Sequence, residues 1–506
     1  MNSPTDNLFL LIQALTKDEK RYFKNSIKET GKSAANYIQL FDAIARQKSY
    51  NEVALKRKFR GERFAKQFSV AKNYLYNLLL KYLANYHAQK SIEDDILQGL
   101  RYVKILYDKK LAHLAKQQLQ KIKDKAIKHE FYSYLVRILL WEFFLERSYL
   151  EFQDWDEAQF EQARNNIEEC LQLERDYTTI RMEASAFVYT LKKKGSFRNY
   201  KNNLAEIVAH PLIQNCTQHP SDKVKIIGLV LQAAQLILTR AYEEALKLWL
   251  AAIQVYHQNL ALCASDKVRY VVALDNALFA AAHSKKTHLF ERVLAQVQPQ
   301  ISLSPLEQLR FDMATHKAVL TYHIRQGNFE QQQLNKALEF FQQNELPDIW
   351  SIPLLLTFAL FHFGLEQYDE ALDALEYITT DTHHAHEGIL SFGLILKLLI
   401  YYEKDELLLM AASIRTVYYH LKKKAHLFEF EKYLLKCLTK AIQLPSKAEI
   451  IPFFQAVKAH LLVLQNQAIG EELEPYTYFN YIAWLEGKIQ QKAFSKMAKD
   501  YAHLLP

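Results

Sequence analysis

One short polar tract holds the densest set of side chains in the sequence that could bind a metal ion. Residues 380–387 read TDTHHAHE, which places three imidazoles (His383, His384 and His386) between two carboxylates. Imidazole and carboxylate groups are common ligands of transition metals. The same composition is typical of a polar loop between two helices, and no HExxH motif accompanies it. We therefore predict a loop that does not bind zinc tightly.

Catalytic motifs are absent from the rest of the sequence. GxGxxG, GxxxxGK[ST] and GxSxG do not occur, and the 11 glycines are too dispersed to form a phosphate cradle. His362 lies in an apolar segment, where a hydrogen-bonded core histidine is expected. The acid pairs Asp94/Asp95 and Asp154/Asp156 lie at turns or helix starts, where capping explains them. We predict a protein that is not an enzyme, with no catalytic residue, no metal and no cofactor. An enzyme site assembled across several helical hairpins is the third hypothesis.

The basic stretch 46–81 is the clearest candidate for binding a polyanion. It contains ten lysines and arginines against two acids, Glu52 and Glu62. A helix over 51–59, a turn around Gly61 and a long helix over 64–86 have the layout of a helix-turn-helix. Lysine and arginine neutralise phosphates, although no base-reading set is evident. The candidate polyanion-binding residues are Lys56, Arg57, Lys58, Arg60, Arg63, Lys66 and Lys72.

The N-terminal segment 1–90 is expected to be a module of its own. It has 17 Lys+Arg and 7 Asp+Glu, whereas the remainder has 47 and 49. In the helix 64–86 the spacing predicts a buried stripe of Leu75, Leu78, Leu79, Tyr82, Leu83 and Tyr86. It also predicts a solvent face of Lys66, Lys72, Asn73 and Tyr76. We expect a helical cap that packs this stripe on the hairpin beginning near Ser91. Nucleic acid and an acidic protein are the alternative partners of its charge.

Glycine and proline are scarce, and this predicts helix almost throughout. The chain of 506 residues has only 11 of each, and no proline occurs between Pro4 and Pro211. The turns of β-rich proteins need glycine, whereas glycine and proline both weaken helices. Four cysteines (Cys170, Cys216, Cys263 and Cys437) lie far apart, so we expect small buried side chains in a reducing compartment.

Short polar turns recur along the chain and predict a repeat of about 42 residues. Each turn precedes an aromatic or aliphatic residue and a new amphipathic helix. Their spacings range from 37 to 46 residues, with turns near Lys110, Asp154, Gly195, Ala241, Lys285, Gly327, Gln367 and Lys404. Helix starts are also marked by capping-box pairs, at Thr16/Glu19, Ser49/Glu52, Ser304/Glu307 and Ser446/Glu449. Such a period is typical of stacked helical hairpins.

Two of these units resemble the tetratricopeptide repeat (TPR). In the first, Tyr242, Ala245, Trp249 and Ala252 have the offsets of an aromatic, a small, a bulky and a small residue in the second helix of that repeat. In the second, the matching residues are Tyr368, Ala371, Leu375 and Ile378. The period exceeds the 34 residues of the family, so the chain looks like a divergent member with longer helices. The resemblance implies a scaffold that binds peptides.

These observations predict an all-α, right-handed α-solenoid of stacked hairpins with a helical cap at each end. We expect three parts: a basic helix-turn-helix-like cap (1–90), a TPR-like solenoid (91–420) and a C-terminal helical cap (421–506). The predicted function is a non-enzymatic scaffold that binds a peptide or protein segment in the solenoid groove. The alternative is a nucleic-acid-binding regulator that uses residues 46–81. No signal peptide or membrane span is expected, and a cytoplasmic location follows.

Overall fold

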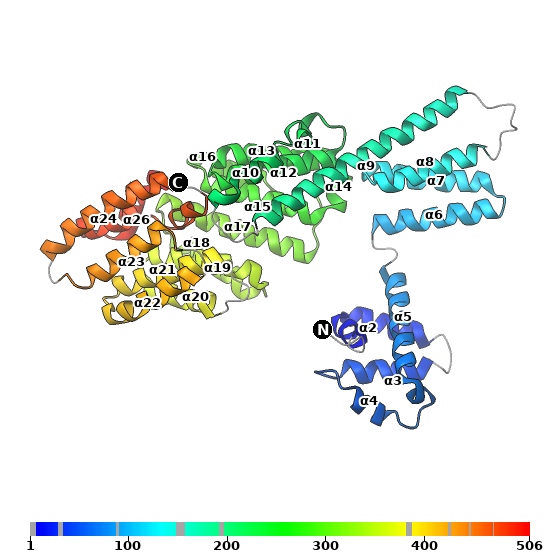
Figure 1. The fold of residues 1–506 in the computed structure, drawn as a ribbon, viewed down its shortest axis with the longest axis horizontal. Coiled ribbons are helices and arrows are strands. Elements are labelled where there is room, and N and C mark those ends of the chain that lie inside the picture. The colour runs from blue at the N-terminus through cyan, green and yellow to red at the C-terminus, as the bar shows by residue number, and fades with distance from the viewer. Residues whose placement is uncertain are drawn as a thin grey trace. The chain divides into compact units, whose positions relative to one another are not determined.

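The computed structural model describes residues 7–28, 34–87, 91–147, 157–191, 197–380, 387–423, 427–444, 447–468 and 470–505. These residues form helices joined by short turns, with no strand among them (Figure 1). The all-α prediction is therefore confirmed. Contacts divide the chain into two compact units, Met1–Cys170 and Leu171–Pro506, and the long helix α9 contributes to both.

The first unit contains the shorter set of helices. They are α1 (Asn7–Ala14), α2 (Lys17–Lys28), α3 (Ala34–Ala45), α4 (Glu52–Lys58), the 3-10 helix η1 (Arg63–Gln67), α5 (Phe68–His87), α6 (Ile92–Asp108), α7 (Ala112–Lys128), α8 (Tyr132–Arg147) and the first part of α9 (Glu157–Leu191).

Helices α1 to α5 enclose an apolar core of their own. Leu75 and Leu79 of α5 are fully buried in it, beside residues of α1, α2 and α3. Tyr82 of the same stripe packs edge-on against Phe23 of α2, with ring centroids 5.6 Å apart. The stripe is thus covered by the module's own helices, and this removes the reason for expecting it to pack on the hairpin near Ser91. The long helix also begins at Phe68 instead of residue 64, because residues 63–67 form a 3-10 turn.

The second unit continues as a series of helices through to the C-terminal region. After the rest of α9 they are α10 (Phe197–Val208), α11 (Pro211–Gln214), η2 (Cys216–Gln218), α12 (Asp222–Leu238), α13 (Tyr242–Gln258), α14 (Leu260–Ser265), α15 (Lys267–His283), α16 (Thr287–Gln296), α17 (Pro305–Gln326), α18 (Gln331–Gln343), α19 (Asp348–Gly364), α20 (Tyr368–Thr380), α21 (Glu387–Glu403), α22 (Leu407–Lys423), α23 (Glu429–Ala441), α24 (Lys447–Gln467), η3 (Gly470–Leu473), α25 (Glu474–Tyr478), α26 (Tyr481–Gln490), α27 (Phe494–Asp500) and η4 (Ala502–Leu504).

Many helices end in the same left-handed turn. After α12, the Arg240 N–H donates to the Ile237 carbonyl (3.1 Å) and the Ala241 N–H donates to the Leu236 carbonyl (2.9 Å). This pairing satisfies carbonyls that the last helical turn leaves open. Among the described residues the left-handed position is held by Lys110, Glu130, Arg240, Gly327, Glu366, Asp405 and Gln491. The turn reverses the chain within about three residues, so neighbouring helices pack side by side.

Helix packing in the second unit follows the chain order. α12 packs on α13, α13 on α15, α15 on α17, α17 on α19, α19 on α20, α20 on α21 and α21 on α22. Trp249 of α13 is buried between the helices of this series, as are Ala245 and Ala252 beside it. All four cysteines are free and buried, as expected.

The C-terminal helices fold back along the turns of the preceding hairpins. Glu403, at the end of α21, accepts a hydrogen bond from the Trp484 indole N–H of α26 (2.6 Å) and pairs with Lys488 (2.5 Å). The Phe494 ring of α27 lies 6.0 Å from Phe329 and 5.2 Å from Phe363. This segment therefore contacts several hairpins along one edge.

Most of the expected turns can be located in the structure. Those near Lys110, Ala241, Lys285, Gly327, Gln367 and Lys404 separate consecutive helices. The turns at Asp154 and Gly195 lie outside the described residues. Among the described residues, no helix has the length and apolar character needed to cross a membrane.

The expected helix caps give a mixed result. The boxes at Thr16/Glu19 and Ser304/Glu307 are formed as reciprocal hydrogen bonds. The Ser49/Glu52 box is wrong, because α4 begins at Glu52 and the Asn51 side chain accepts from the Ala54 N–H at 2.9 Å. Ser446 of the fourth pair lies outside the described residues.

Candidate functional site

Titratable side chains do not gather into a reactive cluster in the part of the chain that the structure describes. No group of three or more His, Cys, Asp or Glu side chains there has a metal-binding arrangement. His383, His384 and His386 lie outside the described residues. His362 is buried, and its Nδ1 lies 2.8 Å from the Gln367 side-chain oxygen, as expected of a satisfied core histidine.

A cavity of about 850 Å³ lies between α7, α8 and the first part of α9. Lysines of α7 pair with glutamates of α8 in the wall of this cavity. Lys123 pairs with Glu142 at 2.5 Å, and Lys116 pairs with Glu146 at 3.6 Å. Each of the two acids is therefore paired with a lysine in the wall of the cavity.

The basic stretch presents most of its described cations to solvent. Lys56, Arg57, Lys58 and Arg60 are exposed on and just after α4, and Lys66 is exposed in η1. Lys56 also pairs with Glu52 at 2.8 Å, one turn earlier in α4. Arg63 begins η1, and its side chain lies outside the described structure. The exposed members are thus solvent-facing cations on α4, just after it and in η1, and the consecutive residues Lys56, Arg57 and Lys58 point in different directions around α4.

Lys72 was predicted as a member of this set, but it is buried. It was expected to face solvent, but it is only 6% exposed and its ammonium group pairs with Glu52 and donates to the Tyr50 hydroxyl. The ammonium also lies 5.4 Å and 5.7 Å from the Tyr50 and Phe68 ring centroids. Hydrogen bonds from the two lysines hold the pKa of Glu52 at about 2, against the effect of burial. Lys72 is thus a structural residue of the module, and no phosphate could reach it without breaking this network.

A second feature is a groove formed by α9, α12, α13 and α15, here called the Trp249 groove. Its cavity has a volume of about 540 Å³ and is mostly apolar. The residues that line it are Arg181, Ala184, Ser185, Val188, Tyr189, Ile226, Ile227, Val230, Leu231, Trp249, Tyr256, Arg269 and Val272. On its α9 wall, Val188 is 49% and Tyr189 67% exposed. Large apolar side chains this open beside a cavity are typical of a binding surface.

Trp249 lies in this groove with its side chain only 3% exposed. Its indole N–H has no hydrogen-bond partner among the described residues. Nine-tenths or more of buried polar groups in folded proteins are paired, so an unpaired indole donor in a groove wall is uncommon. The Tyr256 hydroxyl nearby does have a partner, since it donates to Asp266 at 2.9 Å. The sequence identified Trp249 as a core residue and gave no sign of the unpaired donor.

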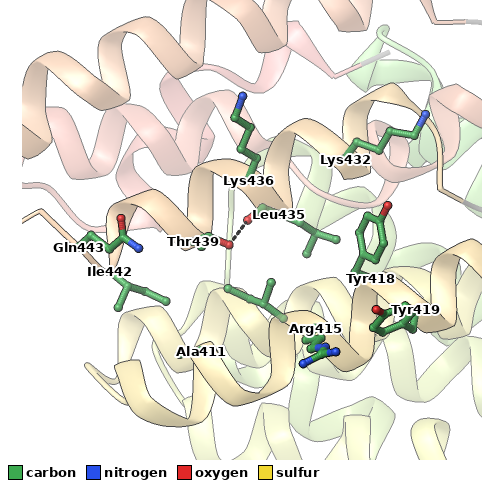
Figure 2. Close-up of a pocket in the computed structure, with 11 residues that line it drawn as sticks. Ala411, Arg415, Tyr418, Tyr419, Lys432, Leu435, Lys436, Thr439, Ile442 and Gln443 are labelled. Carbon is green, nitrogen blue, oxygen red and sulfur yellow. Dashed lines mark hydrogen bonds between the residues drawn. The ribbon is translucent and has the colours of Figure 1, made fainter.

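A third feature is a groove between α22 and α23, with a cavity of about 490 Å³ (Figure 2). Leu435 of α23 and Ile442, directly after that helix, lie across from residues of α22 that include Tyr418. Here the sequence did not single out any residue. The groove depends on how two helices pack, which no periodicity within either helix reveals.

Comparison of the chain with protein-family models, with curated proteins and with solved structures finds no match. The geometry of the described residues is therefore the basis for assigning a function.

Proposed function

We propose that this protein is a non-enzymatic, cytoplasmic interaction scaffold built as a TPR-like α-solenoid, and that it binds a peptide or protein segment in the Trp249 groove. The sequential packing of α12 to α22 and the repeated left-handed turns support the solenoid. A single helical hairpin cannot bury both of its faces, whereas stacked hairpins share a core and keep one surface open for partners.

The observation that carries this proposal is the open apolar wall of this groove, where Val188 is 49% and Tyr189 is 67% exposed beside the cavity. A protein segment brings apolar side chains that can cover both of these residues. Burying the exposed faces of those two side chains adds apolar contact. Catalysis would instead require converging titratable groups in this groove.

The test is site-specific photo-crosslinking in cells of the natural host. A photoreactive phenylalanine analogue at Tyr189 should trap a defined protein segment, identified by mass spectrometry. The same analogue at Glu183, on the same helix but outside the set of groove-lining residues, is the matched control. Adducts of equal yield and identity at both positions, or none at Tyr189, would contradict the proposal.

A variant of the exposed groove wall tests the same site. Tyr189→Ala removes an aromatic ring that the segment would cover, so the trapped segment should bind about fivefold more weakly. The folded chain should be almost unaffected, because Tyr189 is 67% exposed. Unchanged affinity would remove Tyr189 from the binding site.

A nucleic-acid-binding regulator is the second candidate, favoured by the exposed cations on α4 and η1. Any such surface attracts polyanions at low salt, because binding releases counterions. The informative measurement is duplex binding at about 150 mM salt, comparing random with host promoter DNA. A preference of about 10³-fold, lost when Lys56, Arg57 and Arg60 are changed to glutamate, would establish the regulator. Weak binding of equal strength to both DNAs would reject it.

A further inference from the structure

We infer that the groove between α22 and α23 is a second docking site, and that its partner is an acidic, amphipathic protein segment. This inference rests on the proposed scaffold function and adds a separate surface with its own chemistry. Three observations carry it: the charge of the rims, the apolar floor and the exposed tyrosines.

The rims of the groove are basic on both sides. Arg415 of α22 and Lys432 and Lys436 of α23 line the groove, with the two lysine side chains extending outward from α23 (Figure 2). Helix α22 has no acidic residue along its length, and no acidic residue lines the groove. Glu429 is the first residue of α23 and pairs with Lys432 at 2.7 Å. Arg415 and Lys436 form no ion pair with any residue that the structure describes, so their charges remain available to carboxylates of a partner.

Glu431, which is next to Lys432 in α23, does not neutralise the charge of these cations. Glu431 is only 4% exposed, and its burial raises the pKa of its carboxyl to about 8. At neutral pH this carboxyl is therefore mostly uncharged. It accepts a hydrogen bond from the Phe428 N–H (3.0 Å) at the N-terminus of α23. The groove keeps a net positive charge as a result.

The floor of the groove is apolar, and this favours a protein segment over a nucleic acid. Ile414, Leu435 and Ile442 line it, and the Thr439 hydroxyl donates to the Leu435 carbonyl at 2.8 Å (Figure 2). Tyr419 is 55% exposed, and the Arg415 guanidinium lies 5.7 Å from its ring centroid. An amphipathic helix fits such a surface by placing its apolar face on the floor and its charged flanks on the rims.

The test uses a fluorescein-labelled helical peptide with leucines on one face and glutamates on the flanks. Its binding to the full chain is measured by fluorescence anisotropy. The double variant Arg415→Glu/Lys436→Glu should weaken binding about tenfold, because two attractive rim contacts become repulsive. Lys336→Glu/Lys499→Glu is the matched control. It changes two exposed lysines outside the groove and alters the net charge equally, so it should change affinity less than about twofold.

Two further probes define the partner. A peptide with glutamine in place of glutamate should bind about tenfold more weakly if the partner is acidic. A fluorescein-labelled single-stranded oligonucleotide should bind less tightly than the acidic peptide. Equal binding of both peptides, equal loss in the two double variants, or tighter binding of the oligonucleotide would each overturn the inference.

This experiment is independent of the Trp249 groove. If the peptide binds as expected but nothing is trapped at Tyr189, the proposed peptide site fails and the α22–α23 site stands. If the peptide does not bind while Tyr189 traps a partner, only the α22–α23 site fails.

Discussion

The turn after α17 leaves no room for a side chain, so Gly327→Ala should disturb the docking of the C-terminal helix. Gly327 has φ of 64°, and a Cβ there would lie 2.2 Å from the backbone N of Lys499 and 2.4 Å from the carbonyl C of Ala498. Both of these are backbone atoms in α27, so no rotamer change can relieve the overlap. Either α27 moves away or the turn changes its conformation.

The expected cost follows from three contributions. A left-handed alanine costs about 1–2 kcal/mol relative to glycine. Forcing an extra methyl into a packed contact costs about 1–3 kcal/mol. Alanine also lowers the conformational entropy of the unfolded chain, and this offsets the cost by about 0.4–1 kcal/mol. Gly327→Ala should therefore destabilise the second unit by about 1–5 kcal/mol.

The measurement is hydrogen exchange of peptides covering α27 and α17, combined with urea unfolding followed by circular dichroism. The chain has two compact units, so local exchange is more informative than one global transition. Asp405→Ala is the matched control, because Asp405 has φ of 58° in the same kind of turn and already carries a Cβ. It should cost less than about 1 kcal/mol. If Gly327→Ala leaves exchange in α27 unchanged, α27 does not pack on this turn.

Three further changes test other parts of the structure. Trp249→Ala should destabilise the second unit by about 3–5 kcal/mol in urea titration, because it empties a buried interface position; a loss below about 1 kcal/mol would place Trp249 outside the core. Glu431 has a folded pKa of about 8, above its unfolded value of 4.5, so its contribution is full below pH 4.5 and is lost as pH rises through 8. Relative to Glu431→Gln, the natural chain should lose about 3 kcal/mol between pH 4.5 and 7 in urea titrations, and parallel pH profiles would refute this. Lys72→Met should cost about 1–2 kcal/mol by removing a buried partner of Glu52, whereas exposed Lys66→Met should cost less than about 0.5 kcal/mol; equal costs would show that Lys72 is not buried.

Features that depend on neighbours in sequence could be predicted well. The all-α class followed from the scarcity of glycine and proline, and the Ser304/Glu307 capping box followed from residue types three positions apart. Burial of Trp249 followed from helical periodicity. These features depend on residue types a few positions apart in the chain, and a single sequence is enough to reveal them.

Features that depend on contacts across helices could not be predicted. Lys72 was placed on a polar face, yet Tyr50 and Glu52 from another segment cover it. Both candidate grooves arise from gaps between helices, and no pattern within one helix reports the width of such a gap.

The positions of the turns could be predicted from the sequence, but their left-handed conformation could not. Glycine is the usual residue at such a position, and only Gly327 follows that rule among the described turns. Lys110, Arg240 and Glu366 adopt the same backbone without a glycine, so composition alone did not mark the turn type. The polar character of the turns revealed where they lie, and the structure revealed how they are closed.

Occupation of the Trp249 groove by a protein segment can be measured by hydrogen exchange with the trapped segment bound. A synthetic peptide of that segment is added to the purified chain, and backbone protection is compared with and without it. Exchange should become slower in α9 around 181–191 and in α12 around 226–231, which form two walls of the groove. Protection that falls only on other helices, or none at saturating peptide, would contradict this expectation.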